Sequence, residues 1–182
     1  YGDADFVLTA TASSGLPVSY ASSEPAVATV GGATVHIVAA GSTTLTASQP
    51  GNGSYHPAAP VEQVLVVEPV PATVATTAAT AVTISGATLN GSVNANSSPA
   101  TVRFEYGLDS AYGSVAVAEQ SPVSGTTAVA VSAAIDGLLE FTTYHYRVVA
   151  ENAAGSAQGA DLTFTTTRDS GFAISAPSSV FT

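Results

Sequence analysis

Histidine is the side chain in this sequence that could bind a metal ion or transfer a proton near neutral pH. His36 lies within an alternating apolar run, His56 follows a tyrosine in a polar stretch, and His145 lies in the segment TTYHYR. A structural metal site needs several ligands at helix or hairpin spacing, and these three are far apart in the pattern. We therefore expect surface histidines and no bound metal or cofactor.

Serine and threonine are abundant, but the sequence contains no G-x-S-x-G turn that would present a serine nucleophile to a histidine. Their strand propensity and turn chemistry account for them, and we expect no enzymatic activity. Asp3 with Asp5, or Glu151 with Asn152, could supply oxygen ligands to Ca²⁺ at a domain junction. No D-x-[DN]-x-[DN]-G loop is present, so turn chemistry is the favoured interpretation of these residues.

Four charged or titratable side chains are expected on one outer surface. Arg103 and Glu105 alternate with apolar residues in one run, and His145 and Arg147 do so in another. We call these four residues the charged face. Two interpretations remain open, since the face could consist of cross-strand ion pairs or could bind a glycan or another protein.

The overall charge excludes several classes of partner. The chain has 182 residues, thirteen acids, three arginines and no lysine, which gives a formal net charge of −10. Nucleic acids and anionic membranes bind basic surfaces, so we expect neither as a partner. Two uncharged stretches, 25–61 and 69–102, are broken by Pro, Gly, Asn and Ser, so we expect no membrane insertion.

Short alternating runs separated by Gly, Pro, Asn and Asp indicate an all-β chain built of two tandem β-sandwiches. Asn90-Gly91 could signal a hairpin, but the flanking runs are too short, so Gly91 is expected to make room for an aromatic ring. The expected strands of the first sandwich are 6–12, 18–20, 27–30, 34–38, 43–48 and 61–67. Those of the second are within 74–84, then 87–94, 101–106, 114–118, 128–135, 143–150 and 160–166.

The second sandwich should have an aromatic core. Tyr144 and Tyr146 share the inward face of their strand, and Phe104 and Tyr106 share the inward face of another. Leu138 precedes Tyr144 by six positions, the spacing of a corner in which a tyrosine hydroxyl bonds backbone upstream. We expect this bond near residues 138–140.

Glu68-Pro69-Val70-Pro71 marks a boundary between two domains. Closely spaced prolines favour stiff, extended backbone, so residues 69–72 are expected to be a short, semi-rigid linker. It would join a domain of residues 1–68 to one of residues 73–167. Residues 168–182 are expected to be a tail outside both cores.

Two family resemblances agree with this division. The segment YASSEPAVATVGGATVHIVAAGSTTLTA resembles bacterial Ig-like domains of adhesins and secreted proteins, over residues 5–67. ATLNGSVN, FEYG, GLLEFTTYHYRVVAENAAG and LTFTT resemble bacterial fibronectin type III domains. Glu140 stands where these domains usually carry proline, and no tryptophan is present. The resemblance implies that domain one lacks its first strand, leaving an open sheet edge or core gap, and that ISAPSSV opens a further module.

The resemblances imply a role that is structural. We expect a non-catalytic spacer or adhesion pair in a large secreted or cell-surface bacterial protein, extracellular in location and followed or preceded by other domains of the same chain. The alternative is a pair of accessory, glycan-binding modules of an extracellular polysaccharide-active enzyme. The partner would be a protein or a glycan. Without lysine, the Lys–Asn crosslink of many surface stalks cannot form here.

Overall fold

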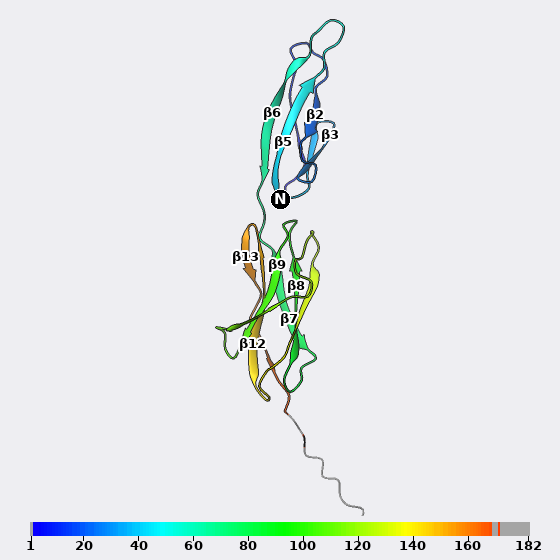
Figure 1. Cartoon of the computed structure of the whole chain (residues 1–182). Helices are drawn as coiled ribbons and strands as arrows, with labels where there is room; N and C mark the ends of the chain where they lie inside the picture. Colours follow the sequence, from blue (N-terminus) through cyan, green and yellow to red (C-terminus); the bar gives the residue numbers. More distant parts are fainter. Residues whose placement is uncertain (1, 169–170, 172–182) are drawn as a thin grey trace, which may run out of the picture.

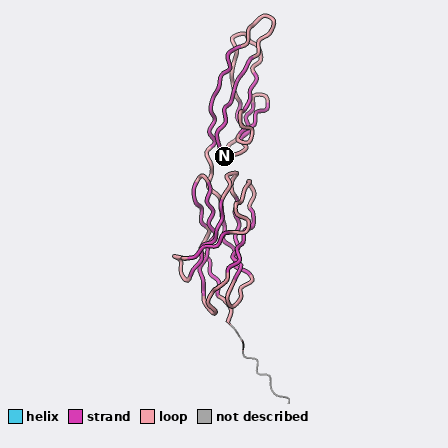
Figure 2. The backbone as a smooth tube through the Cα atoms, in the orientation of Figure 1, coloured by secondary structure: helices cyan, strands magenta, loops and turns pink. Residues whose placement is uncertain are grey.

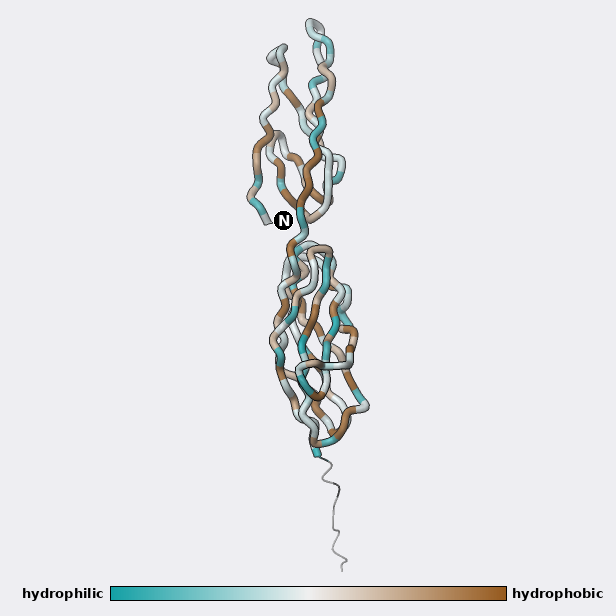
Figure 3. Tube along the Cα trace, turned by 90° about the vertical axis from the view of Figure 1, so that its left-hand side faces the viewer, coloured by the Kyte–Doolittle hydropathy of each residue, from teal (hydrophilic) through white to brown (hydrophobic). Residues whose placement is uncertain are grey.

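The structure is a computed structural model that describes residues 2–168 and 171. Across these residues the chain forms strands β1 to β14 and no helix, which confirms the all-β prediction. Figure 1 shows two elongated bodies stacked end to end, and Figure 2 shows strands running along the length of both. Figure 3 shows hydrophobic and hydrophilic residues alternating along these strands, the pattern of sheets with one buried face.

The first sandwich contains six strands. They are β1 (Phe6–Val7), β2 (Ser19–Ser22), β3 (Ala28–Gly31), β4 (Thr34–Ile37), β5 (Gly41–Gln49) and β6 (Ala58–Val67). One antiparallel sheet has the order β1-β4-β3, and the other has the order β2-β5-β6. Gly32, with φ of 62°, lies in the tight turn between β3 and β4.

The expected strand 6–12 is wrong in length, because β1 covers only Phe6–Val7. β1 pairs with β4 over only two residues, and Phe6 is 37% exposed. The N–H of Leu8 still donates to the carbonyl of Ala33, the position opposite it in this register, but Ala33 belongs to the turn before β4, so the partner strand ends there. Further along, the N–H of Ala10 donates to the hydroxyl of Tyr20 instead. Leu8 does pack on the core, but Ala10 is exposed. The alternation of apolar residues in 6–12 indicates which side chains share a face, but it does not indicate which strand pairs with them or how far the pairing extends.

The core of the first sandwich is small. Its buried cluster consists of Ala28, Val35 and Leu45, with Leu8, Val30 and Leu65 packed against it. The stability of this sandwich therefore rests on a small apolar area.

The second sandwich contains the remaining eight strands. They are β7 (Thr73–Thr80), β8 (Ala87–Asn94), β9 (Thr101–Gly107), β10 (Ser114–Val117), β11 (Val129–Ile135), β12 (Thr143–Asn152), β13 (Gly155–Gln158) and β14 (Leu162–Thr165). One sheet has the order β11-β8-β7, and the other has β10-β9-β12, with both β13 and β14 paired to β12. The sequence did not predict β13, a short strand that forms a hairpin with the end of β12.

The second core is larger and is centred on β9 and β12. Tyr146 and Phe104 are fully buried, and Tyr144 and Leu138 are buried as well. Tyr106 is only half-buried and packs against the edge of this core. The ring of Phe164 stacks on Tyr144 and meets Tyr146 edge-on, each with centroids 5.7 Å apart.

Gly91 does not face an aromatic ring, contrary to the sequence-based expectation. A Cβ at this position would lie 3.1 Å from the Val148 side chain and 3.1 Å from the carbonyl oxygen of Ala75. β8 runs straight through Asn90-Gly91 without a turn. Glycine at position 91 therefore leaves room for the side chain of Val148 in the opposite sheet and for the backbone of the neighbouring strand β7.

The linker lies between the end of β6 and the start of β7, and it is bonded to the second sandwich. The Asn96 amide donates to the carbonyl of Pro71 at 2.8 Å, and the Asn152 amide donates to the carbonyl of Val70 at 2.9 Å. These bonds hold residues 70–71 against the upper loops of the second sandwich. The segment ISAPSSV, residues 174–180, which the sequence assigns to a further module, lies outside the described residues.

Candidate binding face

The structure brings the four residues of the charged face together. β9 and β12 are antiparallel neighbours, with Glu105 opposite Arg147 and Arg103 opposite Val149. His145 lies two residues before Arg147, so it points to the same side of β12. All four side chains are thus on the outer surface of one sheet.

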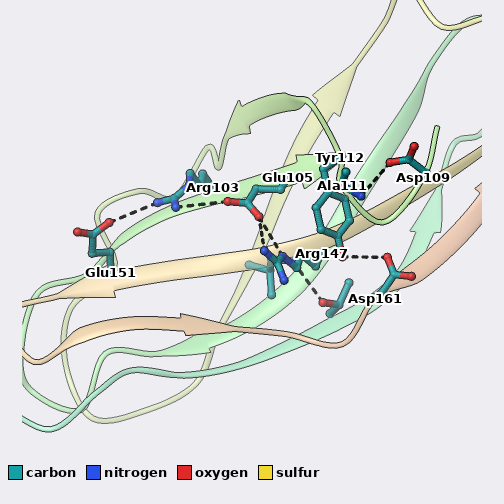
Figure 4. Close-up of polar contacts among 10 residues, drawn as sticks. Arg103, Glu105, Asp109, Ala111, Tyr112, Arg147, Glu151 and Asp161 are labelled. Carbon is teal, nitrogen blue, oxygen red and sulfur yellow. Dashed lines mark hydrogen bonds and ion pairs between the residues drawn. The ribbon is translucent and has the colours of Figure 1, made fainter. Parts of the chain in front are cut away.

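Glu105 is the centre of an ion-pair ladder along this face (Figure 4). Its carboxylate accepts a hydrogen bond from Arg147 Nε at 2.9 Å and pairs with Arg147 Nη2 at 2.8 Å. Arg103 Nη2 lies 3.4 Å from the other Glu105 oxygen, and Arg103 Nη1 lies 3.5 Å from Glu151. The short two-nitrogen contact orients Arg147 more strongly than the longer contacts orient Arg103.

Tyr112 and Asp161 extend the ladder at its other end. The Tyr112 hydroxyl donates to Asp161 Oδ1 at 3.0 Å, and His145 Nδ1 lies 2.8 Å from Asp161 Oδ2. The guanidinium of Arg147 lies over the Tyr112 ring, 4.7 Å from its centroid, which is a cation–π contact. Tyr112 thus joins Arg147 to Asp161.

A tight loop between β9 and β10 places Tyr112 on the face. Asp109 accepts hydrogen bonds from the N–H groups of Ala111 and Tyr112, and Tyr112 has φ of 62°. A Cβ on Gly107 would overlap the carbonyl of Tyr112, so the loop needs glycine there. Sequence reasoning missed Tyr112 and Asp161, since both lie in loops, outside the period-two pattern that located the other four residues.

The network shifts two pKa values. Partial burial and the hydrogen bond to the Asp161 carboxylate raise the pKa of Tyr112 above 10.0. For Asp161, desolvation acts to raise the pKa, but hydrogen bonds from His145 and Tyr112 outweigh it, so the pKa falls below 3.8. Asp161 is therefore ionised at neutral pH.

The charged side chains of this arrangement are paired with one another. Both arginines of the face have carboxylate partners, and the side chains of Arg147 and Glu105 are only 25% and 19% exposed. Among the described residues no group of three or more His, Cys, Asp or Glu side chains could hold a metal ion. The ion-pair interpretation is thus visible in the structure, and a ligand for this face stays a prediction.

The remaining histidines and candidate Ca²⁺ ligands are not gathered at one place. His36 Nδ1 lies 2.7 Å from Asp5 in the first sandwich, on an exposed surface. His56 lies in an exposed loop of that sandwich. For the Ca²⁺ interpretation, Glu151 pairs with Arg103, and the Asn152 side-chain oxygen accepts from the N–H of Ala154. These contacts favour a role in ion pairs and turns, over Ca²⁺ binding, for Asp5 and for Glu151 and Asn152.

Comparisons with known proteins give structural similarity only. No protein family matches the chain, and no curated protein matches it significantly. Within residues 2–168 and 171, no helix is long and apolar enough to cross a bilayer.

One solved structure with a similar fold is the shorter form of the sensor domain of the anti-sigma factor RsgI4 in Pseudobacteroides cellulosolvens, whose sequence is 27% identical to that of this chain. The match covers 54% of this chain and 96% of that one, with a TM-score of 0.42.

The solution structure of the same sensor domain is 23% identical, covers 60% of this chain and 93% of that one, and has a TM-score of 0.40. Domains A168–A170 of titin are 13% identical, over 83% of this chain and 54% of that one, with a TM-score of 0.35. Similarity at this level does not carry a function from those proteins to this chain, which we describe as a pair of β-sandwiches resembling Ig-like and fibronectin type III domains.

Proposed function

We propose that this chain is a non-catalytic spacer: two sandwiches joined by a short, fixed linker that set the distance between neighbouring parts of a large secreted or cell-surface bacterial protein. The observation that carries the proposal is the pair of asparagine bonds to the linker, from Asn96 to Pro71 and from Asn152 to Val70. The bacterial and extracellular part of the proposal rests on the sequence resemblances.

The prolines of the linker and its hydrogen bonds restrict its conformation, as a spacer requires. Pro69 and Pro71 each fix φ and lack an N–H, which leaves residues 68–72 few backbone conformations. The two asparagine amides then bond the carbonyls of this segment. Because the sandwiches are stacked end to end (Figure 1), fixing the linker sets the length and direction of the pair.

Glycan binding by accessory modules is the alternative, and the charged face gives it little support. A sugar-binding face needs polar groups that are available to hydroxyls and an aromatic ring with an open side. Here Glu105 is bonded to both arginines, and Tyr112 has Arg147 over one face of its ring and its hydroxyl bonded to Asp161. Adhesion through this face would need the same groups.

Distance measurements between spin labels test the spacer. The chain has no cysteine, so Ser54→Cys in the first sandwich and Ser110→Cys in the second can be labelled specifically. We expect one narrow distance distribution. The double variant Asn96→Gly with Asn152→Asp removes both linker donors, keeps the Asn152 oxygen that bonds Ala154, and should broaden the distribution.

Asn94→Asp is the matched control, because the Asn94 amide donates to Thr126 within the second sandwich and not to the linker. Its distribution should match that of the unsubstituted chain. A broad distribution in the unsubstituted chain would contradict the spacer. A glycan array distinguishes the alternative: reproducible binding that is lost on Arg147→Ala would favour recognition over spacing.

A further inference from the structure

The first sandwich has an open apolar groove between its two sheets. Its volume is about 430 Å³, and its lining includes Phe6, Leu8, Tyr20, Leu45, Val61 and Leu65. Leu8, Leu45 and Leu65 also belong to the small core of this sandwich. The groove is therefore a place where that core reaches solvent.

β6 borders the groove and is an edge strand. It pairs with β5 on one side and is the last strand of its sheet. Val61, Val64 and Val66 are 68%, 62% and 58% exposed. An exposed apolar edge of this length is a place where another strand can add.

The register shows which backbone groups are available at this edge. The N–H and carbonyl of Thr44 bond Ser23, on the β2 side of β5. Successive residues of a strand direct these groups to opposite sides, so Thr43 and Leu45 bond β6 through their partners Leu65 and Gln63. The backbone groups of Glu62, Val64 and Val66 therefore point away from the sheet.

The negative charge of the first sandwich limits which kind of segment could add to β6. Residues 2–68 contain Asp3, Asp5, Glu24, Glu62 and Glu68 and neither lysine nor arginine, because the arginines are at 103, 147 and 168. Asp5 directly precedes Phe6, and Glu62 lies between Val61 and Gln63, and these three neighbours line the groove. Asp5 also lies 2.7 Å from His36 Nδ1. A second copy of this chain would bring the same acidic surface against itself.

We propose that the β6 edge and its groove bind an extended, basic segment of a partner protein. The segment adds as a further strand on β6, bonding the outward backbone groups of residues 62–66. Its alternate apolar side chains enter the groove against Leu45 and Leu65, and its Lys or Arg residues lie near Asp5 and Glu62. This binding role does not depend on the spacer proposal.

The probe is the synthetic peptide RVTVTVTVR with blocked ends, titrated into the whole chain by calorimetry. We expect saturable binding that weakens at least several-fold as salt rises from about 0.05 M to 0.5 M, because screening removes the attraction between exposed charges. The acidic peptide EVTVTVTVE should bind at least about tenfold more weakly. Equal affinity for the two peptides would overturn the assignment of a basic partner.

Val64→Pro tests the edge itself. Proline is tolerated where an edge N–H faces solvent, so the bonds between β5 and β6 remain while one available donor is lost and the ring obstructs an added strand. Binding should fall at least about tenfold. Val115→Pro in β10 is the matched control, because Val115 is 58% exposed on an edge strand, close to the 62% of Val64, and peptide binding should be unchanged.

Ala47→Phe provides a second route if the proline variant is unfolded by circular dichroism. Ala47 lines the groove, so the larger ring should fill it and reduce binding without changing the backbone edge. Unchanged binding in a folded Val64→Pro or Ala47→Phe variant would overturn the site. Tighter binding of the uncharged peptide FAISAPSSVFT, residues 172–182, or dimerisation of the chain by sedimentation through this edge, would overturn the proposed occupant.

Discussion

The hydroxyl of Tyr144 accepts a hydrogen bond from the backbone N–H of Leu139 at 3.0 Å. The tyrosine ring is buried against Phe164, and Leu138 is buried beside the corner. One side chain thus joins the start of β12 to the turn that precedes it. This contact ties a backbone donor of an otherwise exposed corner to the core of the second sandwich.

Replacing Tyr144 with phenylalanine should cost about 1 kcal/mol in the free energy of unfolding of the second sandwich, the net value of one hydrogen bond. The ring contacts with Phe164 are retained, so the loss isolates the hydroxyl. Urea unfolding followed by tyrosine fluorescence measures it. Tyr55→Phe is the control, because this ring is 52% exposed in a loop, and it should leave stability unchanged.

The two sandwiches should unfold in separate transitions, because they have separate buried clusters. The first sandwich should unfold at the lower temperature, since its cluster has three buried residues while the second includes Phe104, Tyr146 and Leu89. Differential scanning calorimetry checks both statements. Tyr144→Phe should move only the higher transition, and a single cooperative transition would contradict the separation.

Asp161 should make the second sandwich sensitive to acid. Its folded pKa lies below 3.8 because of hydrogen bonds from His145 and Tyr112, so the unfolded state binds more protons as pH falls. The stabilisation is present above the unfolded pKa and is lost as pH falls through the folded pKa. The side chain is 38% exposed, so solvent screening keeps the effect small.

The measurement is the difference in unfolding free energy between the unsubstituted chain and Asp161→Asn, followed from pH 7 down to about pH 2. The difference should be present near neutral pH and should shrink at acidic pH, where the carboxyl group is protonated. A difference that is constant over this range would show that Asp161 does not act through its charge.

Gly91→Ala should destabilise the second sandwich by about 1–3 kcal/mol, the usual cost of overpacking. The added Cβ would lie 3.1 Å from Val148 and from the carbonyl oxygen of Ala75, and the carbonyl belongs to a paired strand that cannot easily move. Thermal unfolding measures the effect. Gly53→Ala, where nothing lies within 4 Å, should leave the melting temperature of both transitions unchanged.

The sequence identified those features that depend on alternation within one strand. Tyr144 and Tyr146 face inward, and Arg103, Glu105 and Arg147 face outward, because side chains on a strand alternate regardless of which strands pair. Tyr112 and Asp161 could not be placed this way. Their positions depend on loop conformations and on which strand lies beside β12, and these are set by tertiary pairing.

The same reason explains the errors in Gly91 and in the first strand. Glycine in a strand indicates a close approach, but the approaching residue, Val148, lies on the opposite sheet. Phe6 to Ala12 has the alternation of a strand, yet the ladder ends where its partner β4 begins, at Thr34, and Ala10 bonds the Tyr20 hydroxyl instead. Alternation predicts which side chains share a face and does not predict how far a ladder extends.

The asparagine bonds to the linker also decide where the molecule can flex. Asn96 and Asn152 both belong to the second sandwich, so residues 70–71 move with that body. Any bending between the two bodies must then take place N-terminal to Val70, where a groove of about 300 Å³ is lined by Gly41 and Val67 on one side and Ser97 and Ala153 on the other. Residues 70–71 therefore lengthen the second sandwich, and the angle between the two bodies is set by the backbone of residues 67–69, where Pro69 fixes φ.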